Sequence, residues 1–405
     1  MFHPDTLDFA AADALLGTHA RSAAPQMLTD IRALVGLESY SRDLPALETA
    51  RKAVRSLAVG HLGEPDRESL DGDGSHGEVL TLTYEGTGGG RVLVVGHYDT
   101  VWPPGTLAGW TDQPEPEGVD GGDSQVLSGP GIFDMKTGLV QGIWALKLLR
   151  DADLPRPTVT FLFNGDEEIG SVFSRDLIEK AALESDAVLV LEATSDGAVK
   201  TARKGVGIFT VRAAGIQAHA GLDPTAGASA IHALAEFVVQ AVRVADLARG
   251  TSLNVGLIEG GSGSNVAAGS ATAVMDIRVT NTDEMSRVDR ELDAITVSDP
   301  RVKISVEHFW NRPPMTAPDP NPLLAAAREA AAGVGLVLRD VSVGGASDAN
   351  FVAALGVPVL CGMGAVGGGA HARGEHIRTG AVPVYTALTA GTLLRLVDGS
   401  PAVRR

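Results

Sequence analysis

The chain has 405 residues, of which 44% are hydrophobic and 20% charged, and its formal net charge is −17 at pH 7. This length and composition predict large buried cores and about two domains. The acidic charge argues against a nucleic-acid partner, because phosphate binding needs a basic face. No stretch approaches the roughly 20 apolar residues of a membrane span, so we expect no membrane partner either.

The N-terminal segment, residues 1–20, lacks the basic region and the continuous apolar core of a secretory signal. The only cysteine, Cys361, lies in the apolar run GVPVLCGMG. A single cysteine excludes an intrachain disulfide, and its apolar surroundings favour packing over a nucleophilic role. We therefore expect a soluble, cytoplasmic protein.

Three apolar runs, at residues 92–96, 158–163 and 187–191, are typical of buried strands. In open α/β sheets, binding and catalytic residues commonly lie just past the carboxyl ends of the strands. The candidate functional side chains that follow these three runs are His97, Asp99, Glu167, Glu168 and Glu192. We expect them to meet at one edge of a sheet.

Two loops add further candidate metal ligands. The sequence SGPGIFDMKTG places Asp134 ahead of a helix-like segment at residues 138–149, and GGGAHARGEHI supplies His371 after a glycine run. Together with His97, Glu168 and Glu192, they make two imidazoles and three carboxylates. This mixture suits zinc, and with one bridging carboxylate it can serve two metals.

The order of the predicted elements indicates an inserted domain. The chain alternates strands and helices in a parallel α/β pattern up to about Ala202 and returns to that pattern after about Pro313. Between them the order is strand, helix, strand, strand, helix, strand, which is the split βαβ unit of ferredoxin-like domains. The predicted ranges are 207–213, 227–249, 252–259, 271–280, 282–295 and 301–309, with Thr282 as the cap of the second helix.

These patterns predict a mixed, mainly parallel sheet in a discontinuous zinc-binding catalytic domain, residues 1–202 and 313–405, and an inserted domain at residues 203–312. The domain is discontinuous because His371 follows the insert, whereas the other candidate ligands precede it. We expect a stiff, proline-rich linker where the chain passes from the inserted domain back to the catalytic domain. Its prolines are Pro313, Pro314, Pro318, Pro320 and Pro322.

Eight motifs keep both residue type and order along residues 92–382. They are GHYDTV, GPGIFDMKTG, FNGDEEIGS, LEATS, AHAG, SNVAAGSATAVMDIR, GGASDANF and GAHARGEHI. With them the chain resembles the di-zinc aminoacylase/carboxypeptidase family of metallopeptidases, and within it the glutamate carboxypeptidases that cleave folates. The resemblance implies a zinc-dependent hydrolase of an amide or peptide bond.

The resemblance implies a ligand set for two zinc ions per chain, with cobalt or manganese as substitutes. His97 and Glu192 would hold one ion, Glu168 and His371 would hold the other, and Asp134 would bridge them. A metal-bound water has a pKa lowered from 15.7 toward about 7, which supplies a nucleophile at neutral pH.

Further roles follow from the same resemblance. Glu167 would be the general base, and Asp99 would orient the ring of His97. His219, in QAHAG, matches the family histidine that stabilises the tetrahedral oxyanion from the lid of a neighbouring subunit. The inserted domain is thus expected to act as a lid and to carry the contact of a homodimer.

Three residues are candidates for substrate binding. Arg278 matches the arginine that holds the substrate α-carboxylate, for which a guanidinium is well suited. Asn265 matches a position that helps to hold the substrate, and Lys204 adds a positive charge. These residues favour an N-acyl amino acid or a peptide with a free C-terminal carboxylate.

Ordinary structural roles compete with several of these assignments. Acidic residues after strands also cap helices or solvate loops, and a histidine such as His219 also occurs in surface loops. His376 is a rival of His371 as a ligand. The glycine-rich runs at residues 86–91 and 260–265 are expected to be a turn and a loop and not phosphate-binding elements.

Three functions are compatible with the sequence. The first is a carboxypeptidase that releases a glutamate-type amino acid, and the second is an N-acyl-amino-acid deacylase like acetylornithine deacetylase. The third is a non-catalytic homologue that keeps the pocket to bind a ligand. It would have lost a ligand or the base, whereas all of these residues are present.

Overall fold

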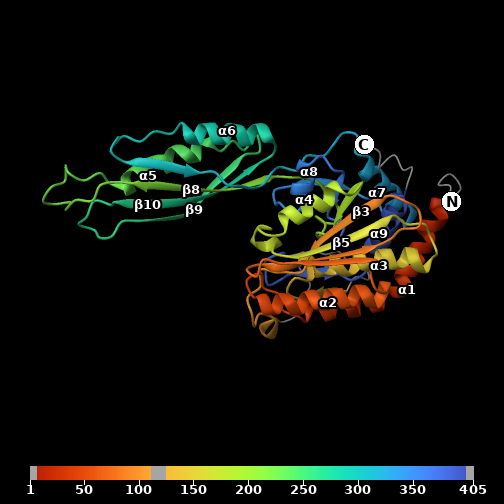
Figure 1. Ribbon diagram of the computed structural model, residues 1–405. Coiled ribbons are helices and arrows are strands. Elements are labelled where there is room, and N and C mark those ends of the chain that lie inside the picture. Colours follow the sequence, from red (N-terminus) through yellow and green to blue (C-terminus); the bar gives the residue numbers. More distant parts are fainter. Residues whose placement is uncertain (1–6, 111–124, 398–405) are drawn as a thin grey trace. The chain divides into compact units, whose positions relative to one another are not determined.

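The computed structural model describes residues 7–110 and 125–397 (Figure 1). Residues 1–6, 111–124 and 398–405 lie outside the described residues. The first of these ranges belongs to the N-terminal segment in which no secretory signal is expected. The chain forms two compact units. The first unit is Met1–Thr201, Ala317–Ser342 and Ser347–Arg405, and the second unit is Ala202–Thr316 and Val343–Ala346. None of the described helices is both long and apolar enough to cross a membrane.

The first unit is built on an eight-stranded mixed sheet with the order β1-β2-β5-β3-β6-β14-β7-β13. The strands are β1 (Arg67–Asp71), β2 (Gly77–Tyr84), β3 (Arg91–His97), β5 (Thr158–Gly165), β6 (Ala187–Val190), β7 (Val199–Arg203), β13 (Asp340–Val343) and β14 (Val359–Cys361). The central strands β5, β3, β6 and β14 are parallel, as predicted. At the flanks, β1 and β2 form an antiparallel hairpin on β5, because a short turn can join only antiparallel strands.

Helices cover both faces of this sheet, with α2 and α3 on one face and α4 and α8 on the other (Figure 1). The helices are α1 (Phe9–Val35), α2 (Leu44–Leu62), α3 (Thr137–Asp151), α4 (Arg175–Leu183), α7 (Pro322–Gly333), α8 (Ala349–Ala354) and α9 (Ala381–Leu394). Helix α3 packs against α1, α2 and α9. Both α3 and α9 are buried on nearly all sides, as expected for helices enclosed by other elements.

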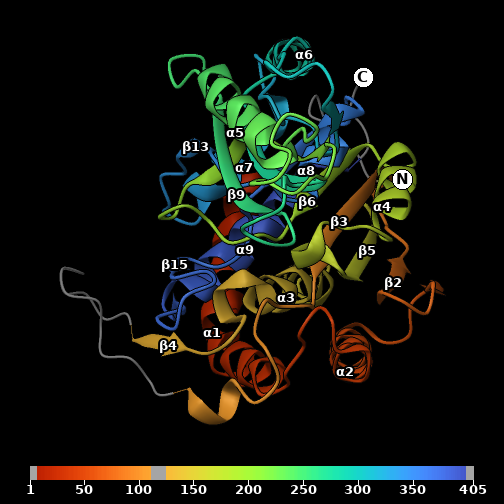
Figure 2. The ribbon, with the colours of Figure 1, turned by 90° about the vertical axis from the view of Figure 1, so that its left-hand side faces the viewer.

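A small three-stranded sheet joins two distant parts of the first unit. Its order is β15 (Gly367–Gly368), β16 (His376–Arg378) and β4 (Val126–Ser128), and all its pairs are antiparallel. Strands β4 and β15 can be followed in Figure 2. The pairing of β16 with β4 lays the segment after His371 against the loop that leads to Asp134.

The second unit is the predicted ferredoxin-like domain. Its sheet has the order β11-β8-β10-β9, and β12 (Trp310–Arg312) also pairs with β8. The elements are β8 (Gly205–Ala214), α5 (Ala230–Ala241), β9 (Ser252–Gly260), β10 (Ser270–Val279), α6 (Thr282–Asp293) and β11 (Lys303–Glu307). Helices α5 and α6 cover one face of this sheet (Figure 1). Strand β10 alternates buried and partly buried residues, as a sheet with one covered face requires.

Two helices of the second unit differ from their predictions. Helix α5 is shorter than the predicted 227–249, because it is followed by a 3-10 turn at Val242–Val244 and then by a turn in which Asp246 accepts the backbone N–H groups of Ala248 and Arg249. The cap of α6 is Asn281 and not Thr282. Its side chain accepts the N–H of Glu284 at 3.0 Å, and asparagine is among the best N-caps.

A buried ion pair joins helix α1 to the residue that follows helix α9. Asp13 of α1 accepts hydrogen bonds from Nη1 of Arg395, at 3.0 Å, and from Nη2, at 2.8 Å. Asp13 is 1% exposed and Arg395 is 7% exposed. Removing one partner of such a pair leaves the other charge buried without compensation, because the nearby Glu329, at 3.4 Å, is mostly exposed.

We therefore expect Asp13→Ala to lower the free energy of unfolding of the first unit by about 3–5 kcal/mol. Urea unfolding followed by far-UV circular dichroism measures this change. The control is Asp151→Ala, which removes the exposed pair between Asp151 and Lys147 and should cost no more than about 1 kcal/mol. Equal losses in the two variants would contradict the importance of the buried pair.

Candidate metal centre

The candidate site lies at the carboxyl edge of the parallel strands in the first unit. Strand β3 ends at His97, and Asp99 follows it. A 3-10 turn at Glu167–Ile169 follows β5, and Glu192 follows β6. Because β3 pairs in parallel with both β5 and β6, all of these side chains arrive at the same edge.

His97 is buried at the centre of the cluster. Its Nε2 lies 3.2 Å from Oδ1 of Asp134 and 3.8 Å from Oε1 of Glu192. On the other side of the ring, Nδ1 lies 3.1 Å from the main-chain oxygen of Asp99 and 3.4 Å from its Oδ1. One nitrogen therefore faces the candidate ligands while the other is held by Asp99, as is usual for metal-binding histidines.

Asp134 lies between the two imidazoles. Its Oδ1 faces His97, and its Oδ2 is 3.5 Å from Nε2 of His371. The same nitrogen of His371 is 3.1 Å from Oε2 of Glu168. The rival His376 is instead part of β16, where its Nδ1 lies 2.8 Å from the main-chain oxygen of Gly374.

Two sets of side chains in this cluster are close enough to hold a metal ion. In each set the possible ligand atoms lie within 4.8 Å of one another. The sets are His97, Glu167 and Glu192, and His97, Asp134 and Glu168. With His371 in contact with Asp134 and Glu168, the structure brings together all of the ligands expected from the sequence, and Glu167 lies beside them.

Asp99 holds more than the ring of His97. Its carboxylate is fully buried and accepts hydrogen bonds from the backbone N–H groups of Glu167, at 3.3 Å, and Glu168, at 3.1 Å. It also accepts the hydroxyl hydrogen of Ser41 at 2.7 Å. Asp99 therefore fixes the turn that carries Glu167 and Glu168 as well as the imidazole, a connection that the sequence did not reveal.

The carboxylates of the cluster raise the pKa of both histidines. Contacts with Asp134 and Glu168 raise the pKa of His371 to about 10. Burial acts to lower the pKa of His97, but Asp134 and Asp99 outweigh it and raise that pKa well above its usual value. Burial also acts to raise the pKa of Asp134, but the two histidines lower it. The cluster therefore has a field that favours positive charge at its centre.

The residues present fit divalent cations. Imidazole nitrogen and carboxylate oxygen are the ligands that zinc accepts, and catalytic zinc sites combine them. Burial raises the pKa of Glu168 to about 7. Its Oε1 is buried and has no hydrogen-bond partner among the residues that the structure describes. A buried carboxylate oxygen of this kind is stabilised when it binds a cation.

Two of the other candidates, His219 and Asn265, are neighbours within the second unit. The Nδ1 atom of His219 accepts the backbone N–H groups of Gly221 and Leu222, both at 3.1 Å. The main-chain oxygen of Asn265 accepts the N–H of Ala220 at 2.8 Å. These contacts leave Nε2 as the ring nitrogen of His219 that can donate a hydrogen bond.

Arg278 of β10 forms a bidentate ion pair with Asp276, with Nε–Oδ1 at 2.7 Å and Nη2–Oδ2 at 2.8 Å. Residues two apart in a strand lie on the same face, so the ion pair could have been predicted from the sequence MDIRV. Lys204 lies between β7 and β8, and its backbone N–H donates to the oxygen of Val343 at 3.1 Å.

One carboxylate that contacts the site's backbone was not predicted from the sequence. Glu375 is fully buried and accepts the N–H of Asp134 at 3.0 Å. The only signal in the sequence is an acidic residue close to His371 in HARGEHI. Spacing alone could not identify its partners, because they lie in a loop far away in the chain.

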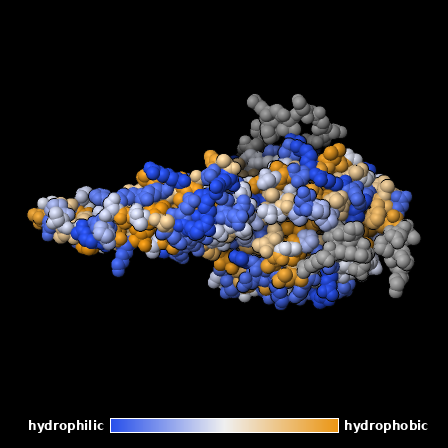
Figure 3. Space-filling view, turned by 90° about the horizontal axis from the view of Figure 1, so that it is seen from above, coloured by the Kyte–Doolittle hydropathy of each residue, from blue (hydrophilic) through white to orange (hydrophobic). Residues whose placement is uncertain are grey.

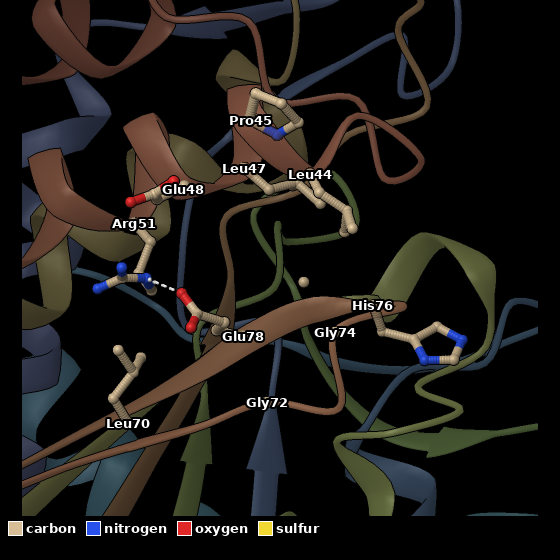
Figure 4. Close-up of a pocket in the computed structure, with 11 residues that line it drawn as sticks. Leu44, Pro45, Leu47, Glu48, Arg51, Leu70, Gly72, Gly74, His76 and Glu78 are labelled. Carbon is tan, nitrogen blue, oxygen red and sulfur yellow. Dashed lines mark ion pairs between the residues drawn. The ribbon is translucent and has the colours of Figure 1, made fainter.

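A separate pocket of about 720 Å³ lies beside α2 and the β1–β2 hairpin (Figure 4). Arg51 and Glu78 point toward each other there, and their ion pair measures 2.8 Å. The hydroxyl of Tyr98 donates to the main-chain oxygen of Glu78 at 2.5 Å. The residues that line this pocket include none of the candidate metal ligands, so it is distinct from the metal centre.

The chain is similar to known peptidases along most of its length. The sequence profile of peptidase family M20/M25/M40 matches residues 93–395. Carboxypeptidase G2 of Pseudomonas sp. (strain RS-16) is 29% identical over 96% of this chain and 93% of its own length. A succinyl-diaminopimelate desuccinylase of Xanthomonas oryzae pv. oryzae is 28% identical over 79% of this chain and 88% of its own.

A solved structure has the same fold. The M20 family metallo-carboxypeptidase Sso-CP2 of Sulfolobus solfataricus superposes with a TM-score of 0.70 at 18% identity, over 91% of this chain and 98% of that one. The profile match, the cluster of imidazoles and carboxylates and the shared fold agree with one another. The chain belongs to peptidase family M20/M25/M40 and is a hydrolytic enzyme of the metallopeptidase class.

Proposed function

We propose that this enzyme is a zinc-dependent carboxypeptidase that releases a C-terminal, glutamate-type amino acid from an N-acyl or peptidyl conjugate. The main support for this proposal is the position of Asp134, with one carboxylate oxygen toward His97 and the other toward His371. A carboxylate placed in this way can bridge two cations. The similarity to carboxypeptidase G2 supports the carboxypeptidase assignment.

Two zinc ions per chain would share this set of ligands, with cobalt or manganese as substitutes. His97 and Glu192 would hold one ion, Glu168 and His371 the other, and Asp134 both. When bound, the ions would lower the pKa of water and polarise the carbonyl of the scissile bond.

Glu167 would carry out the proton transfers. Its backbone is fixed by Asp99, and its carboxylate lies beside His97 and Glu192. From there it would take a proton from the attacking water and pass it to the leaving nitrogen, which is the usual double task of a general acid and base. Asp99 would keep Nε2 of His97 directed at the ligands by holding Nδ1.

The second unit would supply the contacts to substrate. His219 would donate from Nε2 to the oxyanion, and Asn265, adjacent to it, would help to hold the substrate. Arg278 would bind the α-carboxylate of the substrate, which would replace some or all of its hydrogen bonds to Asp276. Lys204 would add positive charge. We propose residues 203–312 as the lid and dimerisation domain, and residues 1–202 and 313–405 as the catalytic domain.

Exposed apolar side chains on the second unit support a homodimer. Leu257 and Ile258 of the edge strand β9 are 67% and 61% exposed, and Val239 of α5 is 56% exposed. Figure 3 shows hydrophobic side chains among hydrophilic ones on the surface of this unit. An exposed sheet edge with apolar residues is a template for pairing with a second chain. We place the dimer in the cytoplasm.

An N-acyl-amino-acid deacylase is the second candidate function. The similarity to a succinyl-diaminopimelate desuccinylase favours it, and the same side chains would carry out the same hydrolysis. The two candidates differ in which side of the amide bond is recognised. Zinc analysis combined with turnover of folate-type glutamates, short peptides and N-acyl amino acids separates them.

The first test concerns the base. We expect Glu167→Gln to lower kcat by about 10²–10⁴. It should leave about two zinc ions per chain, because Glu167 moves protons and does not hold metal. The matched control is its neighbour, Glu168→Gln, which should instead reduce the zinc content measured by plasma emission. Near-native turnover by Glu167→Gln would show that another group is the base.

The second test concerns the subunits. If His219 acts in the partner's site, inactive His219→Ala chains mixed and re-paired with inactive Glu167→Gln chains should regain activity, because one of the two sites in each heterodimer is then complete. His232→Ala, on the exposed face of α5, should stay active on its own. Purified heterodimers without activity would place His219 in its own subunit's site or outside catalysis.

The third test concerns the substrate's charge. Arg278→Ala should reduce kcat/KM for free-acid substrates by roughly tenfold to a hundredfold and leave zinc content unchanged, because one charge-assisted contact is lost. Neutral amides of the same substrates should be affected far less. Arg278→Lys should restore only part of the preference, because a point charge lacks the fork geometry. Equal turnover of acids and amides by the unmodified enzyme would refute the carboxylate contact.

A further inference from the structure

The carboxylate of Glu375 accepts four hydrogen bonds inside the first unit, three of them from the backbone that leads to Asp134. Oε2 accepts the indole N–H of Trp102 at 2.8 Å and the backbone N–H of Gly131 at 2.9 Å. Oε1 accepts the N–H groups of Phe133, at 2.9 Å, and Asp134, at 3.0 Å. Glu375 is 0% exposed, so water does not compete for these contacts.

This set of donors is specific for a carboxylate. An amide or a neutral acid would direct an N–H or O–H group at one of the donors, whereas both oxygens of a carboxylate accept. Hydrogen bonds to a charged acceptor are also stronger than neutral ones. Burial raises the pKa of Glu375, and the N–H donors act in the opposite direction.

The main chain of Glu375 also joins the two ligand-bearing segments. Its carbonyl oxygen accepts the hydroxyl hydrogen of Ser128 at 2.7 Å and the N–H of Gly129 at 3.4 Å. Strand β16, which begins at the next residue, pairs with β4. The segment that carries His371 is therefore bound to the loop before Asp134 by both the side chain and the backbone of one residue.

The loop depends on these external acceptors. Gly131 has the left-handed φ of 72°, and Asp134 has φ −119° and ψ 93° within a stretch of otherwise helical hydrogen bonding. A segment with such dihedral angles cannot satisfy its own N–H groups as a regular helix does. The carboxylate of Glu375 supplies acceptors for Phe133 and Asp134 at the point where the ligand side chain leaves the backbone.

We infer that Glu375 is a positioning residue that fixes the carboxylate of Asp134 between His97 and His371 and thereby sets the affinity of this site for zinc. The inference rests on the proposed zinc site. It adds a carboxylate that binds neither metal nor substrate and acts through the backbone of the bridging ligand. Partners of this kind commonly change metal affinity by 10–100-fold when they are replaced.

The test is the zinc affinity of Glu375→Gln, measured by competition with a chromogenic chelator. We expect binding to weaken about 10–100-fold, because the amide nitrogen would oppose an N–H donor. The matched control is Glu38→Gln, since Glu38 accepts the backbone N–H groups of Gly105, at 2.8 Å, and Leu107, at 2.9 Å, in a loop that carries no ligand. Its zinc affinity should not change.

A second variant keeps the inference testable if Glu375→Gln fails to fold. Trp102→Phe removes one donor and leaves the three backbone hydrogen bonds, so zinc binding should weaken by a smaller factor, roughly two- to tenfold. Unchanged affinity in a folded Glu375→Gln chain, or in Trp102→Phe if that is the only folded variant, would overturn the inference.

Thermal unfolding of the metal-free chains separates positioning from simple support of the fold. A lower midpoint for Glu375→Gln with zinc affinity equal to the unmodified enzyme would make Glu375 purely structural and overturn the inference. If the unmodified enzyme itself binds no zinc, the proposed function fails and the inference fails with it. If the unmodified enzyme binds zinc and only the inference is wrong, Glu375→Gln and the unmodified enzyme will have equal zinc affinities.

Discussion

Groups of opposite charge surround the carboxylate of Asp134 and organise the site. One partly buried carboxylate faces two imidazoles, and the neighbouring acids raise the pKa of both rings. Such a concentration of carboxylates is costly to bury unless positive charge compensates it. A divalent cation meets that requirement better than a proton, because it accepts several ligands at once.

A second layer of groups holds this cluster in place. Asp99 accepts N–H groups from the turn that carries Glu167 and Glu168, and it also holds the ring of His97. Glu375 does the same for the loop that carries Asp134. In both cases a buried carboxylate binds backbone, so that ligands from distant parts of the chain are fixed by contacts that are not themselves to metal.

The sequence predicted what depends on local pattern and failed where distant partners decide. The apolar runs before His97 and Glu192 predicted the parallel centre of the sheet, because buried parallel strands are apolar throughout. The end of α5 depends on the turn made by Asp246, and the role of Glu375 depends on a loop more than two hundred residues earlier in the chain. Neither is visible in hydrophobic periodicity.

Crystals of the zinc-loaded enzyme, with anomalous scattering recorded on both sides of the zinc absorption edge, would show whether Asp134 bridges two zinc ions. We expect two zinc peaks, one on each side of the carboxylate of Asp134, with His97 and Glu192 at one and Glu168 and His371 at the other. Zinc bound only elsewhere, or a single ion that Asp134 does not contact, would contradict it.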